Sequence, residues 1–107
     1  MQEVTVEQLH ERLQRGERPF ILDVREAYEW DICNLQAQGA KLIPLGELQQ
    51  RVTELERDQD IVVICRTGVR SAHAVHFLSE LGYTSVANLV GGIHAWARAF
   101  DPSMPQY

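Results

Sequence analysis

The run Ile61-Val62-Val63-Ile64 constrains the fold of this chain more than any other feature of its sequence. Four consecutive β-branched residues predict a short strand, and an unbroken apolar run is typical of a strand buried in a parallel sheet. A helical pattern follows, beginning at Ser71, a favourable N-cap, and ending at Gly82. The apolar positions of that helix are Ala74, Val75, Leu78 and Leu81. A strand followed by a helix indicates an α/β fold.

The rest of the chain alternates strand and helix patterns in the same way. Further strands are expected at 20–22, 40–43 and 83–90. Helices are expected between Thr5 and Gly16, at 26–31 and 45–55, and after Gly91-Gly92 as far as Phe100. Thr5 and Gln8 have the spacing of a capping box. The tail 101–107 contains two prolines and is not expected to be helical. We therefore expect a central, mostly parallel sheet flanked by helices.

Length and composition fit an ordinary globular domain. The 107 residues are expected to form one domain over 1–107, with 45% hydrophobic and 23% charged residues. No apolar stretch approaches the ~20 residues of a membrane span, and the N-terminal segment lacks an apolar signal. A net charge of −5 disfavours general nucleic-acid binding. We therefore expect a cytoplasmic protein without membrane or nucleic-acid partners.

The two cysteines, Cys33 and Cys65, are far apart in the sequence. Neither forms a CxxC pair or a Cys/His pattern with the spacing of metal ligands, so no metal site is predicted. Without an export signal, both thiols are expected to be free, and a disulfide between them is the less favoured alternative.

The loop from Cys65 to Arg70 places a thiol at the carboxyl end of the strongest strand, where ligands bind in open parallel sheets. Arg66 and Arg70 add two guanidinium groups, and Gly68 lets the backbone curl around an anion. The N-terminus of the following helix presents free N–H groups at the same place. Because all these effects favour a thiolate, Cys65 is a candidate nucleophile.

Four motifs occur in the order of a known family. They are Leu22-Asp23-Val24-Arg25; Gly39-Ala40 before Ile43-Pro44-Leu45; Cys65-Arg66-Thr67-Gly68-Val69-Arg70-Ser71; and Leu89-Val90-Gly91-Gly92 with Ala95-Trp96. Together they resemble the single-domain rhodanese family of sulfurtransferases, which implies a three-layer α/β domain. Segments 28–35 and 96–107 also resemble the rhodanese module at the C-terminus of fusions with an E1-like adenylyltransferase.

One segment departs from the family pattern. Many single-domain rhodaneses carry a His-Ile-Pro-Gly-Ala stretch before the third strand, whereas segment 34–40 of this chain is longer and lacks the His and the Pro. The departure leaves the Cys65 loop intact. It puts in doubt the local turn and any partner contact there.

The resemblance implies a role for the loop. Cys65 would take sulfane sulfur from thiosulfate or a protein persulfide and pass it to a thiophilic acceptor. Arg66 and Arg70 would bind the anionic donor, and Thr67, Gly68 and Val69 would contribute backbone N–H groups. No metal or organic cofactor is required. The implied partners are a ubiquitin-like sulfur-carrier protein, in molybdopterin or thiamine synthesis, and an E1-like adenylyltransferase.

Residues outside that loop are expected to act structurally. Asp23 and Arg25, at a strand end, would organise the site by hydrogen bonds, while Ser71 would mainly cap its helix. Cys33 is expected to be a packing residue rather than a second thiol of the reaction. His73 and His76 are expected to be surface or packing residues.

Two other functions remain open from the sequence. A related phosphatase or arsenate reductase also places a Cys loop before a helix, but its Cys and Arg are usually separated by five residues. Here only the four residues 66–69 intervene, a loop that suits a single sulfur better than a phosphate. A non-catalytic rhodanese fold that docks a partner is the other alternative, although such modules often lose the cysteine.

Overall fold

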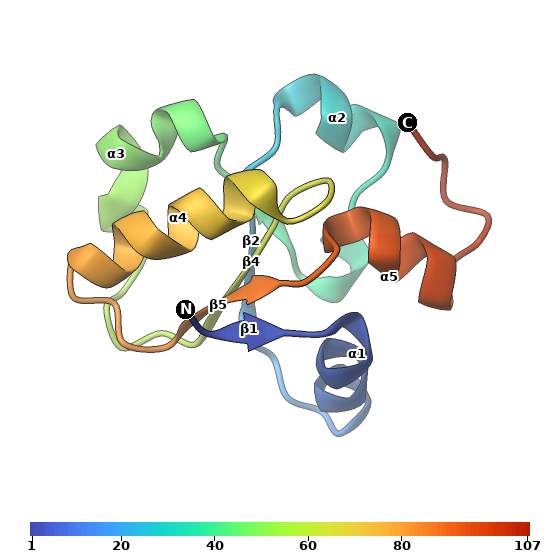
Figure 1. Cartoon of the computed structure of the whole chain (residues 1–107), viewed down its shortest axis with the longest axis horizontal. Helices are drawn as coiled ribbons and strands as arrows, with labels where there is room; N and C mark the ends of the chain where they lie inside the picture. Colours follow the sequence, from blue (N-terminus) through green and yellow to red (C-terminus); the bar gives the residue numbers. More distant parts are fainter.

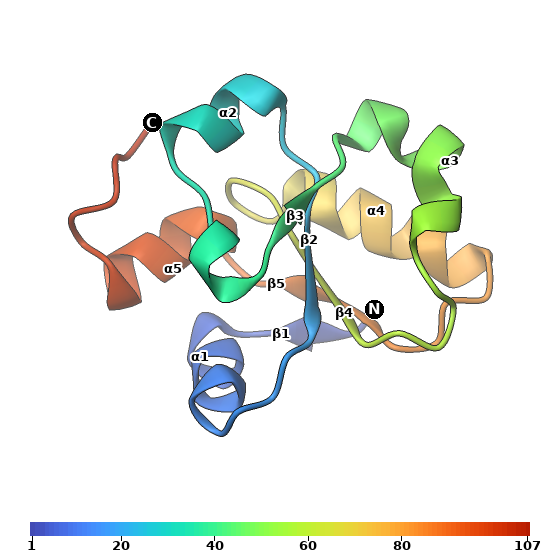
Figure 2. The same cartoon turned by 180° about the vertical axis from the view of Figure 1, so that it is seen from behind.

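The computed structural model describes residues 1–107 and contains a five-stranded sheet with helices on both faces (Figures 1 and 2). The strands are β1 (Glu3–Val4), β2 (Phe20–Asp23), β3 (Lys41–Leu42), β4 (Ile61–Ile64) and β5 (Val86–Leu89). Their order across the sheet is β1-β5-β4-β2-β3, and every pair of neighbours is parallel. The predicted parallel α/β fold is therefore confirmed.

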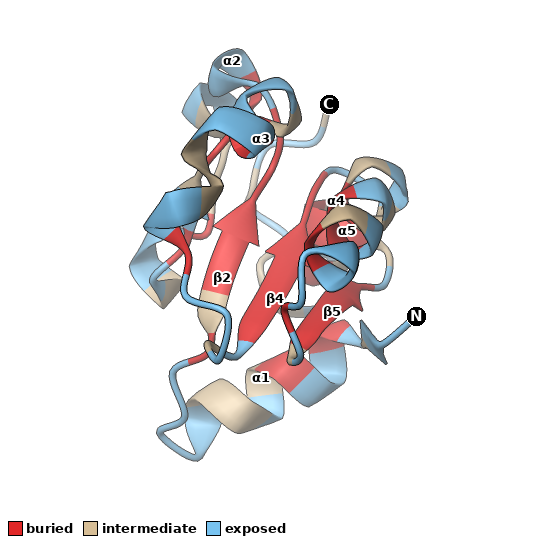
Figure 3. Ribbon diagram, turned by 90° about the vertical axis from the view of Figure 1, so that its left-hand side faces the viewer, coloured by how far each residue is buried: buried red, intermediate tan, exposed pale blue.

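The helices cover the sheet in two layers. They are α1 (Val6–Gln14), α2 (Ala27–Ile32), α3 (Leu48–Arg51), α4 (Val69–Glu80) and α5 (Gly92–Phe100). Three short 3₁₀ helices, η1 (Gln36–Gln38), η2 (Leu45–Glu47) and η3 (Val52–Glu54), lie in the connections. Figure 3 shows the buried strands between helices whose outer faces are exposed. None of the helices has both the length and the apolarity needed to cross a lipid bilayer.

Alternate residues of β4 point into the two layers of the core. Ile61 and Val63 pack with residues of α3 and α4, including Leu48 and Leu78. Val62 and Ile64 pack with residues of α1 and α5 on the other face. All four side chains of β4 are fully buried, which explains why its apolar run is unbroken. The prediction of this strand, including both of its ends, is confirmed.

Several predicted boundaries were wrong. The strand predicted at 83–90 is shorter and comprises only β5. Tyr83 lies outside it, and its hydroxyl donates to the carbonyls of Val52 and Leu55. The strand predicted at 40–43 is only β3, an edge strand paired through two residues. Strand β1 was missed, because its two residues have no pattern of their own and pair only with β5.

Two predicted helices also need correction. The segment 45–55 is not one helix but η2, α3 and η3 in succession; it contains Gly46 and the β-branched pair Val52-Thr53, which are poor helix formers. The helix expected from Ser71 begins at Val69, with Gly68 at its N-cap position in the left-handed conformation (φ 111°). Ser71 is therefore not the N-cap. The capping box of Thr5 and Gln8, in contrast, is present as predicted.

The sheet places two predicted site segments next to each other. Asp23 and Ile64 are register partners on adjacent strands, so Arg25 and Cys65 follow at the same edge of the sheet. The chain leaves β2 toward β3 and leaves β4 toward β5, in opposite directions across the sheet. In parallel sheets, the carboxyl ends of strands at such a reversal are where ligands bind.

Candidate active site

The Cys65 side chain lies in the loop between β4 and α4. It is 1% exposed, and its Sγ accepts a hydrogen bond from the backbone N–H of Gly68 at 3.1 Å. The positive φ of Gly68 lets the chain turn back toward the sulfur before α4 begins. The sulfur is thus close to the N-terminal end of α4, where backbone N–H groups and the helix dipole favour negative charge.

A polar chain inside the molecule reaches the same sulfur. The Ser71 hydroxyl lies 3.2 Å from Cys65 Sγ and donates to Asn88 Oδ1 at 2.5 Å. The Asn88 amide in turn donates to the Gly68 carbonyl at 3.1 Å. A hydroxyl has one hydrogen, so Ser71 accepts from a Cys65 thiol while it donates to Asn88. When Cys65 is a thiolate, the Ser71 hydroxyl can rotate and donate its hydrogen to the sulfur instead of to Asn88.

The N-terminus of α5 supports the outer side of the loop. The N–H of Ile93 donates to the Cys65 carbonyl at 2.9 Å, and the N–H of His94 donates to the Arg66 carbonyl at 3.1 Å. These contacts need Gly92, because a Cβ at that position would lie 2.5 Å from both carbonyl oxygens. Gly92 also has a positive φ of 61°, which disfavours any other residue.

The two arginines of the loop have different surroundings. Arg70 donates two hydrogen bonds to the Glu29 carboxylate, at 2.5 and 2.8 Å. Its hydrogen bond with Glu29 raises the pKa of Arg70 and lowers the pKa of Glu29 to about 2. Arg66 takes part in none of the ion pairs of the structure. Its guanidinium lies 4.8 Å from the centre of the Tyr107 ring.

A buried ion pair lies behind these groups. The side chains of Asp23 and Arg25 are fully buried, and Arg25 donates to both Asp23 oxygens at 2.8–3.0 Å. Arg25 also donates to the Cys33 carbonyl at 2.7 Å and to the Tyr107 hydroxyl at 2.8 Å. Burial opposes the charge of Arg25, but the hydrogen bonds to Asp23 and Tyr107 keep its pKa above the ordinary value.

Residues 5–99 match the family of the Rhodanese-like domain. The chain belongs to this family. The resemblance seen in the sequence motifs is thus confirmed, and so is the three-layer fold expected from it.

Rhodanese-like relatives include fusions and free-standing proteins. The chain is 36% identical over 106 residues to the probable adenylyltransferase/sulfurtransferase MoeZ of Mycobacterium tuberculosis, matching 97% of this chain and 26% of that protein. It is 38% identical over 96 residues to a sulfurtransferase of Allochromatium vinosum, matching 90% of this chain and 88% of that protein. The chain thus spans about a quarter of MoeZ, and its similarity to adenylyltransferase fusions agrees with the sequence motifs.

A solved structure has the same fold over nearly the whole chain. The rhodanese-related protein of Thermoplasma volcanium superposes with a TM-score of 0.83 at 34% sequence identity, covering 94% of each chain. The comparisons therefore establish a rhodanese-domain protein of a family that contains sulfurtransferases.

The structure brings most of the predicted site residues together. Gly68 and Ser71 contact the Cys65 sulfur directly, while Asp23 and Arg25 form the buried pair beneath the site. The side chains of Thr67 and Val69 are exposed and form no hydrogen bond with the rest of the site. Cys33 and Cys65 are both free thiols, with Cys33 half-buried. His73 and His76 lie exposed on α4, as expected.

Sequence reasoning missed three residues of the site: Glu29, Asn88 and Tyr107. Asn88 is a buried polar residue in the middle of an apolar strand, and that contrast was a usable signal. Glu29 lies in a motif noted only as a resemblance. Tyr107 contacts Arg25, which is 82 positions away, and the sequence carries no local signal for that contact. No group of three or more His, Cys, Asp or Glu residues forms a candidate metal centre.

Proposed function

We propose that this chain is a sulfurtransferase in which Cys65 carries sulfane sulfur as a persulfide. The observation that carries the proposal is the position of Cys65 Sγ, 3.1 Å from the Gly68 N–H at the N-terminal end of α4. Both the attacking thiolate and the terminal sulfur of a persulfide are anionic, so both are stabilised there. Residue 65 therefore has the environment that a sulfur carrier needs.

The proposed reaction conserves charge and needs no external oxidant. The Cys65 thiolate attacks the outer sulfur of thiosulfate, a new S–S bond forms at Cys65, and the S–S bond of thiosulfate breaks to release sulfite. A nucleophilic acceptor then attacks the terminal sulfur, the persulfide S–S bond breaks, and the Cys65 thiolate is regenerated. A protein persulfide can replace thiosulfate as the donor, in which case a thiolate leaves instead of sulfite.

The loop divides donor binding and positioning between its two arginines. Arg66 is exposed and unpaired, so we assign it the sulfonate oxygens of the donor. Arg70 is already neutralised by Glu29, and we assign it the task of holding the loop against α2. The backbone N–H groups of Thr67, Gly68 and Val69 surround the transferred sulfur in this proposal.

Three further residues support the site. The Ser71 hydroxyl stabilises the sulfur of Cys65 when it is ionised. The pair of Asp23 and Arg25 fixes the end of β2 beside the loop.

The acceptor that we propose is a sulfur-carrier protein of the ubiquitin-like kind, with an E1-like adenylyltransferase as a further partner, because one relative is named as an adenylyltransferase/sulfurtransferase.

The surroundings of Arg70 argue against phosphatase chemistry. A phosphatase needs its loop arginine to bind the transferred phosphoryl group. The bidentate bond to Glu29 uses that guanidinium, and Glu29 itself would repel a phosphate dianion. The four residues between Cys65 and Arg70 also form a smaller loop than that chemistry usually uses.

Thiocyanate formation from thiosulfate and cyanide tests the proposal. We expect turnover in the parent protein and in Cys33→Ser, and none above background in Cys65→Ser. A parent protein that forms no thiocyanate, or a Cys65→Ser variant that turns over like the parent, contradicts the proposal. Hydrolysis of an aryl phosphate, measured on the same preparations, tests the phosphatase alternative.

A further inference from the structure

The segment after α5 returns to the candidate active site. After Phe100 the chain turns at Asp101, where the Met104 N–H donates to the Asp101 carbonyl at 3.0 Å. From there the chain runs to its C-terminus, which lies next to α2 in both views of the ribbon (Figures 1 and 2), and the Tyr107 hydroxyl contacts Glu29 of that helix. The proposed persulfide chemistry leaves this segment without a role.

The Tyr107 hydroxyl is held from two sides. It accepts a hydrogen bond from Arg25 Nη1 at 2.8 Å and donates one to Glu29 Oε2 at 2.8 Å. Burial, opposed by the Arg25 hydrogen bond, raises the pKa of Tyr107 to about 12, so the phenol keeps the hydrogen that it donates. Both partners are themselves buried and paired, with Asp23 and Arg70. The position of the aromatic ring is therefore fixed by the interior of the site.

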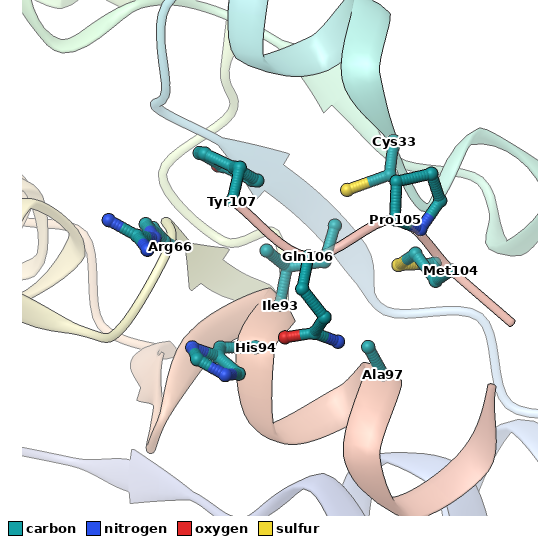
Figure 4. Close-up of a pocket in the computed structure, with 9 residues that line it drawn as sticks. All are labelled: Cys33, Arg66, Ile93, His94, Ala97, Met104, Pro105, Gln106 and Tyr107. Atoms are coloured by element: carbon teal, nitrogen blue, oxygen red, sulfur yellow. The ribbon is translucent and has the colours of Figure 1, made fainter. Parts of the chain in front are cut away.

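The ring of Tyr107 faces the one loop arginine that lacks a carboxylate. The Arg66 guanidinium lies 4.8 Å from the ring centre, within the range of a cation–π interaction. Both side chains line a small pocket beside the Cys65 loop, with Cys33 and Met104 on its other side (Figure 4). An unpaired arginine side chain has many rotamers in water, and the ring favours those that keep its charge beside this pocket.

We propose that Tyr107 is a positioning residue for Arg66, whose guanidinium it holds beside the Cys65 loop so that the site favours anionic reagents over neutral ones. The proposal rests on the assignment of Arg66 to the anionic donor made above. The ring performs the positioning, and the hydroxyl serves to hold the ring. A cation–π contact at an exposed arginine corresponds to about a two- to fivefold preference.

Alkylation of Cys65 measures this preference without sulfur transfer. Iodoacetate and iodoacetamide both alkylate a thiolate through their CH2 carbon, but the first is an anion and the second is neutral. Because both reagents must reach the same sulfur, the ratio of their rate constants does not depend on its accessibility and reports the electrostatic potential around it. The rates are read by mass spectrometry on the peptide that contains Cys65, which separates them from reaction at Cys33. The variants are Tyr107→Leu, Tyr107→Phe, Arg66→Gln and the double variant Arg66→Gln/Tyr107→Leu.

We expect Tyr107→Leu to lower the iodoacetate-to-iodoacetamide ratio by about two- to fivefold. Tyr107→Phe keeps the ring but loses the two hydrogen bonds that hold it, so its ratio should lie between those of the parent and the leucine variant. In the Arg66→Gln background, the leucine substitution should have no further effect. A purely structural role of Tyr107 would change both rate constants together and leave the ratio unchanged.

Two results would overturn the proposal. They are a parent-like ratio in Tyr107→Leu and a leucine effect that persists undiminished in Arg66→Gln. Neither depends on persulfide formation, which thiosulfate tests separately. If Cys65 fails to take sulfur while the alkylation ratio behaves as expected, the proposed function fails and the positioning of Arg66 stands.

Discussion

The Arg70 guanidinium and the Glu29 carboxylate form a bidentate ion pair, with N···O distances of 2.5 and 2.8 Å. The Glu29 side chain is only 3% exposed, and Arg70 is the main reason that its pKa falls to about 2. The pair joins α2 to the first turn of α4, so it ties the Cys65 loop to the helix that faces it.

Acidification should therefore weaken the fold through Glu29. Its pKa is lower in the folded protein than its ordinary 4.5, so its stabilisation is complete above pH 4.5 and is lost as the pH falls toward 2. The full effect is at most about 3 kcal/mol, of which about 2 kcal/mol is lost by pH 3. Urea unfolding of the parent and of Glu29→Gln at pH 7 and pH 3 measures it. The two proteins should differ clearly at pH 7 and much less at pH 3, and an equal difference at both would refute this account.

Replacing Arg25 by Gln should destabilise the protein by about 3–5 kcal/mol, because Asp23 would stay buried without its counter-charge. Arg51→Gln is the control, since Arg51 also forms ion pairs, with the carboxylates of Glu47 and Glu54, but at the surface. Urea unfolding at neutral pH should show a large loss for the first variant and a much smaller one for the second. Similar losses of stability in the two variants would contradict the expectation that burial makes the Asp23–Arg25 pair costly to break.

Gly92→Ala should be far more damaging than Gly46→Ala. The new Cβ at residue 92 would meet the carbonyl oxygens of Cys65 and Arg66 at 2.5 Å, in a backbone conformation of positive φ. A Cβ at residue 46 would meet nothing within 4 Å. We expect Gly92→Ala to lose more than about 3 kcal/mol of stability, or to fail to fold, with little change for Gly46→Ala. Thermal unfolding of both variants checks this, and equal melting temperatures would contradict it.

Local signals explain what the sequence could predict. The apolar run of β4 and the capping box at Thr5 depend on neighbouring residues only, and both were predicted correctly. Ser71 has the right chemistry for an N-cap, but α4 begins two residues before it with Gly68 at the cap position, and the Ser71 hydroxyl contacts Cys65 and Asn88 instead. The contact with Asn88 joins α4 to β5, and no local pattern reveals it.

The same reasoning explains the rest of the site. The Cys65 loop could be placed because it directly follows the strongest strand. The different surroundings of Arg66 and Arg70 could not be predicted, because they come from Tyr107 and Glu29, which are distant in the sequence. Two arginines that look equivalent in the loop are thus distinguished only by tertiary contacts.

Ser71→Ala should slow sulfur transfer about tenfold, since a hydrogen bond to a charged sulfur would be lost. Asn88 would also lose the donor to its Oδ1, so a modest loss of stability should accompany the change. Ser79→Ala, at an exposed position of the same helix, is the control and should behave like the parent. Initial rates of thiocyanate formation make the comparison, and a parent-like rate for Ser71→Ala would remove the hydroxyl from the proposed chemistry.

The intact mass of the protein after incubation with thiosulfate shows whether Cys65 carries sulfur. The parent and Cys33→Ser should each gain the mass of one sulfur atom, and cyanide should remove it. Cys65→Ser should gain nothing under the same conditions. A parent protein that gains no sulfur, or a Cys65→Ser variant that gains as much as the parent, would contradict the assignment of Cys65 as the sulfur carrier.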